Sequence, residues 1–128
     1  MSDLKDPAPI ATPEQYRAAL LAVRQRMTDV HLKMLQAHCR SEGHSISTDH
    51  LAELVGIRIA ISAKTTYSNY AHWIADALEY VPEPSAKKQT WLYALAHGRP
   101  DATEKVDGKY EWIMRPELVT ALQAMKWA

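Results

Sequence analysis

The sequence lacks several features that would assign it quickly to a class of protein. Its single cysteine, Cys39, excludes an internal disulfide and is typical of a reducing compartment. No apolar run approaches the roughly 20 residues that a membrane-spanning helix needs. The N-terminal stretch MSDLKDPAPIATP has neither the basic start nor the apolar segment of a signal peptide. We therefore expect a cytoplasmic protein with no membrane partner.

An excess of charge of one sign is also lacking. The chain contains 15 Lys and Arg residues and 15 Asp and Glu residues, so its formal net charge is zero. The charges are also mixed along the chain, with eight basic and seven acidic residues between Arg58 and Arg115. Attraction to phosphate supplies most non-specific affinity for nucleic acid, so neutrality weighs against such a ligand. Any basic surface must arise from sorting of charges in three dimensions.

Signals of catalysis are missing as well. There is no phosphate-cradling glycine loop, no strand-to-helix turn carrying a nucleophilic serine, and no recognisable pair of metal-binding carboxylates. His38, Cys39, His44 and His50 lie close in sequence, but the adjacent His38 and Cys39 must point to different sides of a helix. We therefore predict no enzyme, no cofactor and no metal site, with Cys39 as a core residue.

What the sequence does contain is a set of clear helix signals. At 47% hydrophobic residues the chain can bury the core of one domain, which we place at residues 12–128 after a flexible lead-in at 1–11. Thr12 and Gln15 form a capping box around Pro13 and begin the first helix. A second helix should end near residues 41–43. Thr28 either caps it or lies inside one long helix.

The best-specified segment is residues 47–80. Ser47 is a good N-cap, and Gly56 ends the short helix that follows. Ile57, Ile59 and Ile61 then alternate with other residues, which is compatible with a short strand or an extended link. Ser62 is the expected cap of a longer helix, which buries the stripe Tyr67, Ala71, Ile74, Ala75 and Leu78. The pattern predicts a helix-turn-helix.

The pattern changes after Pro82 and Pro84. Aromatic residues alternate in the segments TWLYALA (90–96) and KYEWIM (109–114), which predict a two-stranded ribbon with a long polar tip. Pro116 then begins a closing helix. The predicted fold class is α+β, mainly α: a winged helix-like bundle of four to five helices with one β-hairpin wing.

Particular motifs suggest a family. The run LAELVG, the residues Tyr, Ser, Ala and Ile of TTYSNYAHWIADAL, and WIMRPELVTAL resemble a small domain of bacterial and phage proteins. That domain occurs alone or beside His-Asn-His restriction nucleases. The resemblance covers residues 28–127 and implies a winged-helix fold that binds modified or foreign DNA in restriction or phage defence. Ile57, Lys64 and Ser68 depart from the usual Tyr, Asn and Gly, so no base preference is carried over.

DNA contact is predicted on the polar side of the second helix, with the 90–115 hairpin as the wing. Lys and Asn side chains can bond base edges, Thr and Ser can contact either base or phosphate, and flanking cations can hold phosphates. The candidate DNA-binding residues are Arg58, Lys64, Thr65, Ser68, Asn69, Lys87, Lys88 and Arg99.

Other interpretations remain open at this point. The same polar side can be an ordinary solvated helix surface, or it can bind a protein, as in a phage-encoded inhibitor or an assembly subunit. Mixed charge in the hairpin suits a protein partner equally well. The first and last helices, with Met125 and Trp127, could form a homodimer or close the core. The tryptophans are expected mainly in the core, with Trp73 bridging core and surface.

Overall fold

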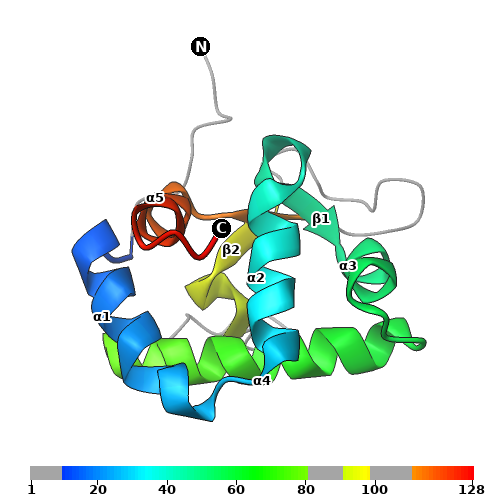
Figure 1. The fold of residues 1–128 in the computed structure, drawn as a ribbon, viewed down its shortest axis with the longest axis horizontal. Helices are drawn as coiled ribbons and strands as arrows, with labels where there is room; N and C mark the ends of the chain where they lie inside the picture. The colour runs from blue at the N-terminus through cyan, green and yellow to red at the C-terminus, as the bar shows by residue number, and fades with distance from the viewer. Residues whose placement is uncertain (1–9, 81–90, 99–110) are drawn as a thin grey trace, which may run out of the picture.

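The computed structural model describes residues 10–80, 91–98 and 111–128. Helices dominate these residues, and a small antiparallel sheet lies among them (Figure 1). The elements, in chain order, are α1 (Pro13–Val23), η1 (Arg24–Arg26), α2 (Asp29–Arg40), η2 (Glu42–His44), β1 (Ser45–Ser47), α3 (Thr48–Val55), α4 (Ala60–Leu78), η3 (Trp91–Ala94), β2 (Ala96–Gly98), β3 (Glu111–Met114) and α5 (Pro116–Ala124), where η denotes a 3-10 turn.

The predicted caps of α1 and α3 are confirmed. The Thr12 hydroxyl accepts from the Gln15 N–H at 3.1 Å, and the Gln15 side chain accepts from the Thr12 N–H at 2.8 Å. Ser47 Oγ accepts from the His50 N–H at 3.1 Å. Gly56 ends α3 with a φ of 80°, a conformation that glycine adopts without the strain of a Cβ. These local signals fix where α1 and α3 lie in the chain.

The alternative left open at Thr28 is resolved in favour of a new helix. The chain turns through η1 after α1, and α2 begins at Asp29. His31 Nδ1 accepts the Thr28 N–H at 3.0 Å, which satisfies a donor that the helix itself cannot pair. The break separates α1 from α2, and α5 and the C-terminal residues lie between the two helices (Figure 1).

The predicted start of the long helix was wrong. Ser62 does not cap it, because α4 already begins at Ala60 and its N-cap is Ile59. Ile59 has an extended backbone, with φ −115° and ψ 118°, and its carbonyl accepts from the N–H groups of Ser62 and Ala63. The alternating isoleucines therefore form no strand, and residues 57–59 are a short link between α3 and α4.

The predicted two-stranded ribbon is only partly correct. The sheet has three strands in the order β1-β3-β2, and both pairs are antiparallel. Ile46 and Gly98 lie opposite Trp112 on its two sides. The sequence did not predict the added strand, β1, and marked only its last residue, Ser47, as a helix N-cap. The expected tip of the hairpin lies in residues 99–110, outside the described ranges.

The segment predicted as the first strand begins as a 3-10 turn instead. Trp91–Ala94 forms η3, and β2 starts only at Ala96. Side chains bind the carbonyls of this turn: Tyr16 Oη donates to Ala94 O at 2.7 Å, and Arg115 Nε donates to Tyr93 O at 2.8 Å. These bonds occupy carbonyls that a strand would use for its neighbour. Trp91 thus does not lie in a strand, although Trp112 does.

The core lies around α4, which packs against α1, α3 and η3. Its predicted stripe is buried at Tyr67, Ala71, Ile74 and Ala75, and Leu78 packs against the same core. Ala11, the last residue of the expected lead-in, is also buried, while residues 1–9 lie outside the described ranges. Within the described part of the chain, no helix is both long enough and apolar enough to cross a membrane.

Candidate nucleic-acid interface

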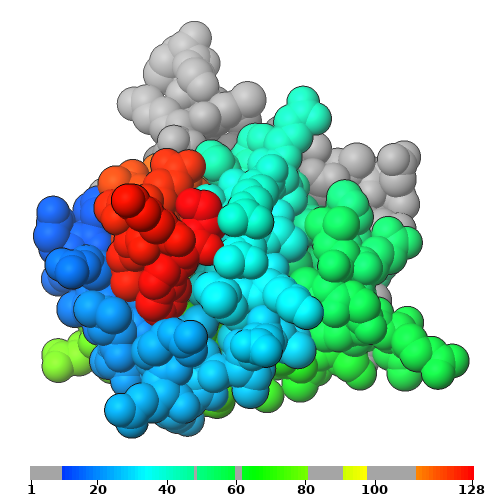
Figure 2. All heavy atoms as spheres, viewed as in Figure 1, coloured from blue at the N-terminus to red at the C-terminus, as the bar shows by residue number. Residues whose placement is uncertain are grey.

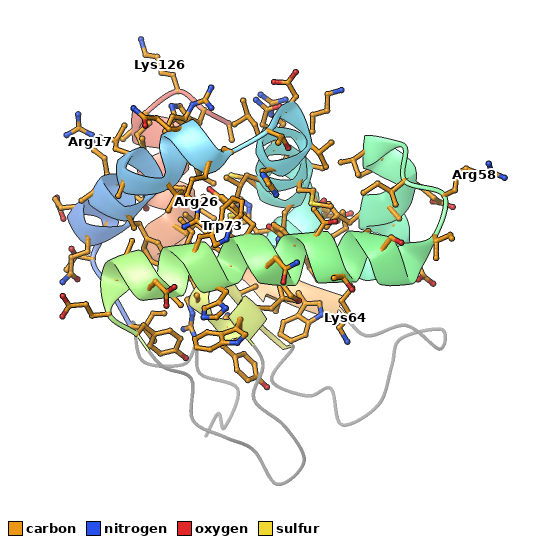
Figure 3. The ribbon with its side chains drawn as sticks, turned by 90° about the horizontal axis from the view of Figure 1, so that it is seen from below. Arg17, Arg26, Arg58, Lys64, Trp73 and Lys126 are labelled. Atoms are coloured by element: carbon orange, nitrogen blue, oxygen red, sulfur yellow. The ribbon has the colours of Figure 1, made fainter. Side chains whose placement is uncertain are left out.

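The helix pair α3–α4 presents part of the predicted DNA-binding set to solvent. Thr65 and Asn69 are exposed and lie one helical turn apart, so they share one side of α4. Lys64 is exposed on the neighbouring flank, where Ser68 is only half-buried. Arg58 is exposed in the link before α4, and Figure 3 shows Arg58 and Lys64 directed away from the body of the protein.

The remaining predicted contacts cannot be placed beside these residues. Lys87, Lys88 and Arg99 lie outside the described ranges. The structure therefore brings together Thr65 and Asn69, with Lys64 and Ser68 next to them and Arg58 at the start of the helix.

The charge on this helix pair is not basic. Between Thr48 and Leu78 the chain has two cations, Arg58 and Lys64, and three acids, Asp49, Glu53 and Asp76. Asp76 Oδ1 lies 3.6 Å from His72 Nε2, in a pair that is largely solvent-exposed. Contacts to base edges by Thr65 and Asn69 are chemically possible. The attraction that brings a phosphate backbone close must come largely from elsewhere on the protein.

An aromatic cluster joins the middle of α4 to η1 and α2. The His31 and Tyr70 rings stack with centroids 5.1 Å apart, and the Trp73 ring meets His31 edge-on at 5.1 Å. Tyr70 Oη donates to Met27 Sδ at 3.3 Å, and the Arg26 guanidinium lies 4.2 Å from the centre of the Trp73 ring. Tyr70 is fully buried, whereas Trp73 is partly exposed and bridges core and surface as predicted (Figure 3).

A buried histidine on α2 forms a second connection, to α4 and β3, which the sequence reasoning missed. His38 is completely buried, with Nδ1 2.8 Å from Tyr67 Oη and Nε2 2.9 Å from Trp112 O. A carbonyl oxygen can only accept, so Nε2 carries the proton and Nδ1 accepts from the Tyr67 hydroxyl. Burial lowers the pKa of His38 to about 4. The available signal was its position three and four residues after Leu35 and Met34, on the buried side of α2.

The other histidine and cysteine candidates have structural environments. His44 Nδ1 lies 2.6 Å from Cys39 O and so satisfies the end of α2. Cys39 is buried, and burial raises the pKa of its thiol, which disfavours the reactive thiolate. Across residues 10–80, 91–98 and 111–128, no group of three or more His, Cys, Asp or Glu side chains could hold a metal ion.

Arg115 lies in RPEL, the most specific part of the segment WIMRPELVTAL that resembles the family, and it has a structural position. Its side chain is buried, and its Nε donates to Tyr93 O while its backbone N–H donates to Leu95 O at 3.0 Å. These two bonds therefore hold the start of α5 against the η3–β2 segment.

Comparisons of the chain with protein-family models, with curated proteins and with solved structures find no match. The family resemblance stays a prediction from the motifs.

Proposed function

We propose that this protein is a non-enzymatic DNA-binding module with a winged-helix-like architecture. In this proposal α3 and α4 are the helix-turn-helix, and the hairpin that contains β2 and β3 is the wing. The order α2, α3, α4 and then a hairpin is the order expected of a winged helix. The strand β1, which lies between α2 and α3 in the chain, pairs with β3 and is the third strand of the same sheet.

One observation carries the proposal. After α3, which ends at Gly56, and the short link that follows, α4 presents Thr65 and Asn69 together on its solvent side, with Lys64 alongside. Asn can form two hydrogen bonds with an adenine edge, and Lys can contact guanine or phosphate. In a helix-turn-helix the second helix enters the major groove with its N-terminal residues against the bases. Arg58, just before that helix, would hold a phosphate.

The family resemblance suggests which class of DNA the protein binds. It favours modified or foreign DNA as the target, which is the material that restriction systems distinguish from host DNA. Accordingly, the duplexes compared in an experiment include methylated and unmethylated forms of the same sequence.

The specificity of α4 is tested by the double substitution Lys64→Ala/Asn69→Ala. We expect discrimination between a preferred duplex, selected from a random pool, and a scrambled one to fall by roughly 1–3 kcal/mol for a lost bidentate base contact. Competition measured by fluorescence anisotropy gives this ratio directly. The matched control is Thr120→Ala/Gln123→Ala, which removes two exposed polar side chains from α5. Unchanged discrimination in the α4 variant would refute its role in recognition.

A protein partner is the second candidate, because two large apolar side chains flank the α3–α4 link. Leu54 is 54% exposed and Ile59 is 63% exposed. Exposed apolar residues on both sides of Arg58 suit a protein surface better than a phosphate backbone. Absence of duplex binding at low salt would favour this alternative, for which an assembly subunit or a phage-encoded inhibitor is the expected class.

A further inference from the structure

Basic side chains gather on a surface outside α4, the helix that we propose contacts the bases. From Arg17 to Arg40 the chain has five Lys and Arg residues and a single acid, Asp29. This stretch forms α1, η1 and α2, and Figure 2 shows α1 and α2 on one side of the molecule with the C-terminal residues between them. Lys126 adds a sixth cation from those C-terminal residues. We call this surface the basic face: Arg17, Arg24, Arg26, Lys33, Arg40 and Lys126.

Specific contacts hold the three parts of the basic face together. Gln36 Nε2, on α2, donates to Trp127 O at 2.9 Å. The Arg24 guanidinium, on η1, lies 5.7 Å from the centre of the Trp127 ring. The C-terminal segment is thus fixed against both η1 and α2, and the cations are carried by one ordered surface.

The basic face is hollowed on both sides of the Gln36–Trp127 bond. One groove is lined by Arg17, Leu21, Ala124, Met125 and Trp127, with a volume of about 550 Å³. The other is lined by Lys33, Gln36, Ala37, Arg40, Ser41, His50 and Leu54, with a volume of about 430 Å³. Cations therefore border two grooves, which lie on either side of the hydrogen bond between Gln36 and Trp127.

Four of these cations form no ion pair within the described part of the chain. Arg17, Lys33, Arg40 and Lys126 are all exposed, and none forms an ion pair with another described residue. The nearest acids in sequence to Arg17, Lys33 and Arg40 are Glu14, Asp29 and Glu42. Glu14 and Asp29 lie in the first turns of α1 and α2, where the helix dipole favours a carboxylate. The uncompensated charge makes the surface attractive to an anionic ligand.

We infer that the basic face binds the phosphate backbone of duplex DNA. Its charges are distributed over α1, η1, α2 and the C-terminal segment, which suits a long, evenly charged ligand better than a small anion. A symmetric contact between two copies through this face would place like charges opposite each other, which argues against a homodimer here. The inference takes its class of ligand from the proposed function, but it does not require α4 to read bases.

The basic face also reaches the proposed recognition helix. The Arg26 guanidinium lies over the Trp73 ring (Figure 3). Trp73 lies one helical turn beyond Asn69, on the side of α4 that Asn69 shares with Thr65. The exposed polar residues of α4 and the cations of η1 thus lie on adjoining parts of the surface. A backbone held on the basic face would pass beside α4.

Two double variants with equal loss of charge test the inference. Lys33→Gln/Arg40→Gln removes two cations from the basic face, and Arg58→Gln/Lys64→Gln removes two from the helix pair. All four side chains are exposed, so both variants are expected to fold, which circular dichroism checks. Binding to a labelled 30-base-pair duplex is measured by fluorescence anisotropy across a salt series. For the basic-face variant we expect roughly tenfold weaker binding at 0.1 M salt and a slope of log affinity against log salt that is smaller by about 2.

The outcomes separate the inference from the proposed function. A reduced slope in the basic-face variant supports the inference, whether or not the helix-pair variant is also affected. A normal slope in the basic-face variant with a reduced slope in the helix-pair variant overturns the inference and leaves the proposed function standing. Failure of the wild-type protein to bind duplex at low salt overturns both.

Discussion

The outward sides of α4 and of α1 and α2 differ in chemistry. On α4 the exposed residues include uncharged polar side chains, as at Thr65 and Asn69, and the surrounding helix pair has more acids than cations. On the basic face the cations are exposed and lack described ion-pair partners. The side chains proposed to discriminate bases and the charges proposed to bind phosphate therefore lie on different elements. A neutral chain can form a basic surface because folding, rather than composition, sorts its charges.

The positions of both surfaces depend on the same side-chain contacts between elements. His38 connects α2 to α4 through Tyr67 and to β3 through Trp112 O. The Arg26–Trp73 contact connects η1 to α4 near the surface. Changes at His38 should therefore disturb both surfaces together, whereas the double variants described above should disturb one at a time.

The largest effect is expected for His38→Phe. The substitution leaves the buried Tyr67 hydroxyl and the Trp112 carbonyl without their partner, and each loss costs about 1–3 kcal/mol. We expect the free energy of unfolding in urea to fall by about 4 kcal/mol, with loss of both binding surfaces at once. His50→Phe, at an exposed position, is the control and should change stability by less than about 0.5 kcal/mol. Equal stability of the two variants would show that the buried hydrogen bonds contribute little.

A somewhat smaller effect is expected from acid. The pKa of His38 is about 4 in the folded protein and 6.5 ordinarily, so the unfolded chain binds a proton that the folded state does not. The stabilisation is complete above pH 6.5, is lost as the pH falls toward 4, and amounts to about 3 kcal/mol. Burial also lowers the pKa of His31, which adds to the loss in the same direction.

Urea unfolding at pH values from 7 to 4 measures this dependence. The non-titrating variant His38→Gln should lack most of the decline between pH 6.5 and 4. A parallel decline in the variant would assign the acid sensitivity to other groups. Because the effect is reversible, it allows both binding surfaces to be weakened and restored in one sample.

The sequence predicted the elements whose signals are local. Thr12, Ser47, Gly56 and Pro116 mark helix ends through the conformation of one or two residues, and the structure places helix ends at each of them. The amphipathic pattern also identified the buried side of α4. The predicted start of α4 was wrong because the N-cap of this helix is Ile59, which has an extended backbone but no side chain that could form a capping hydrogen bond.

The missed features depend on contacts between distant parts of the chain. β1 is three residues long and exists through pairing with β3, more than 60 residues away, so it has little pattern of its own. η3 replaces a strand because Tyr16 and Arg115 bind its carbonyls. In the basic face, a bond from Gln36 to Trp127 joins α2 to the C-terminal residues that carry Lys126. No local pattern in the sequence indicates that these segments meet.

The central claim, that this protein binds DNA, is tested most directly with the unmodified wild-type chain. Fluorescence anisotropy with methylated and unmethylated forms of a labelled duplex, each across a salt series, measures affinity and its dependence on charge. We predict binding at low salt, with log affinity falling linearly as log salt rises and a slope that counts the phosphates contacted. Absence of binding to every duplex at low salt would contradict the claim and direct attention to a protein partner.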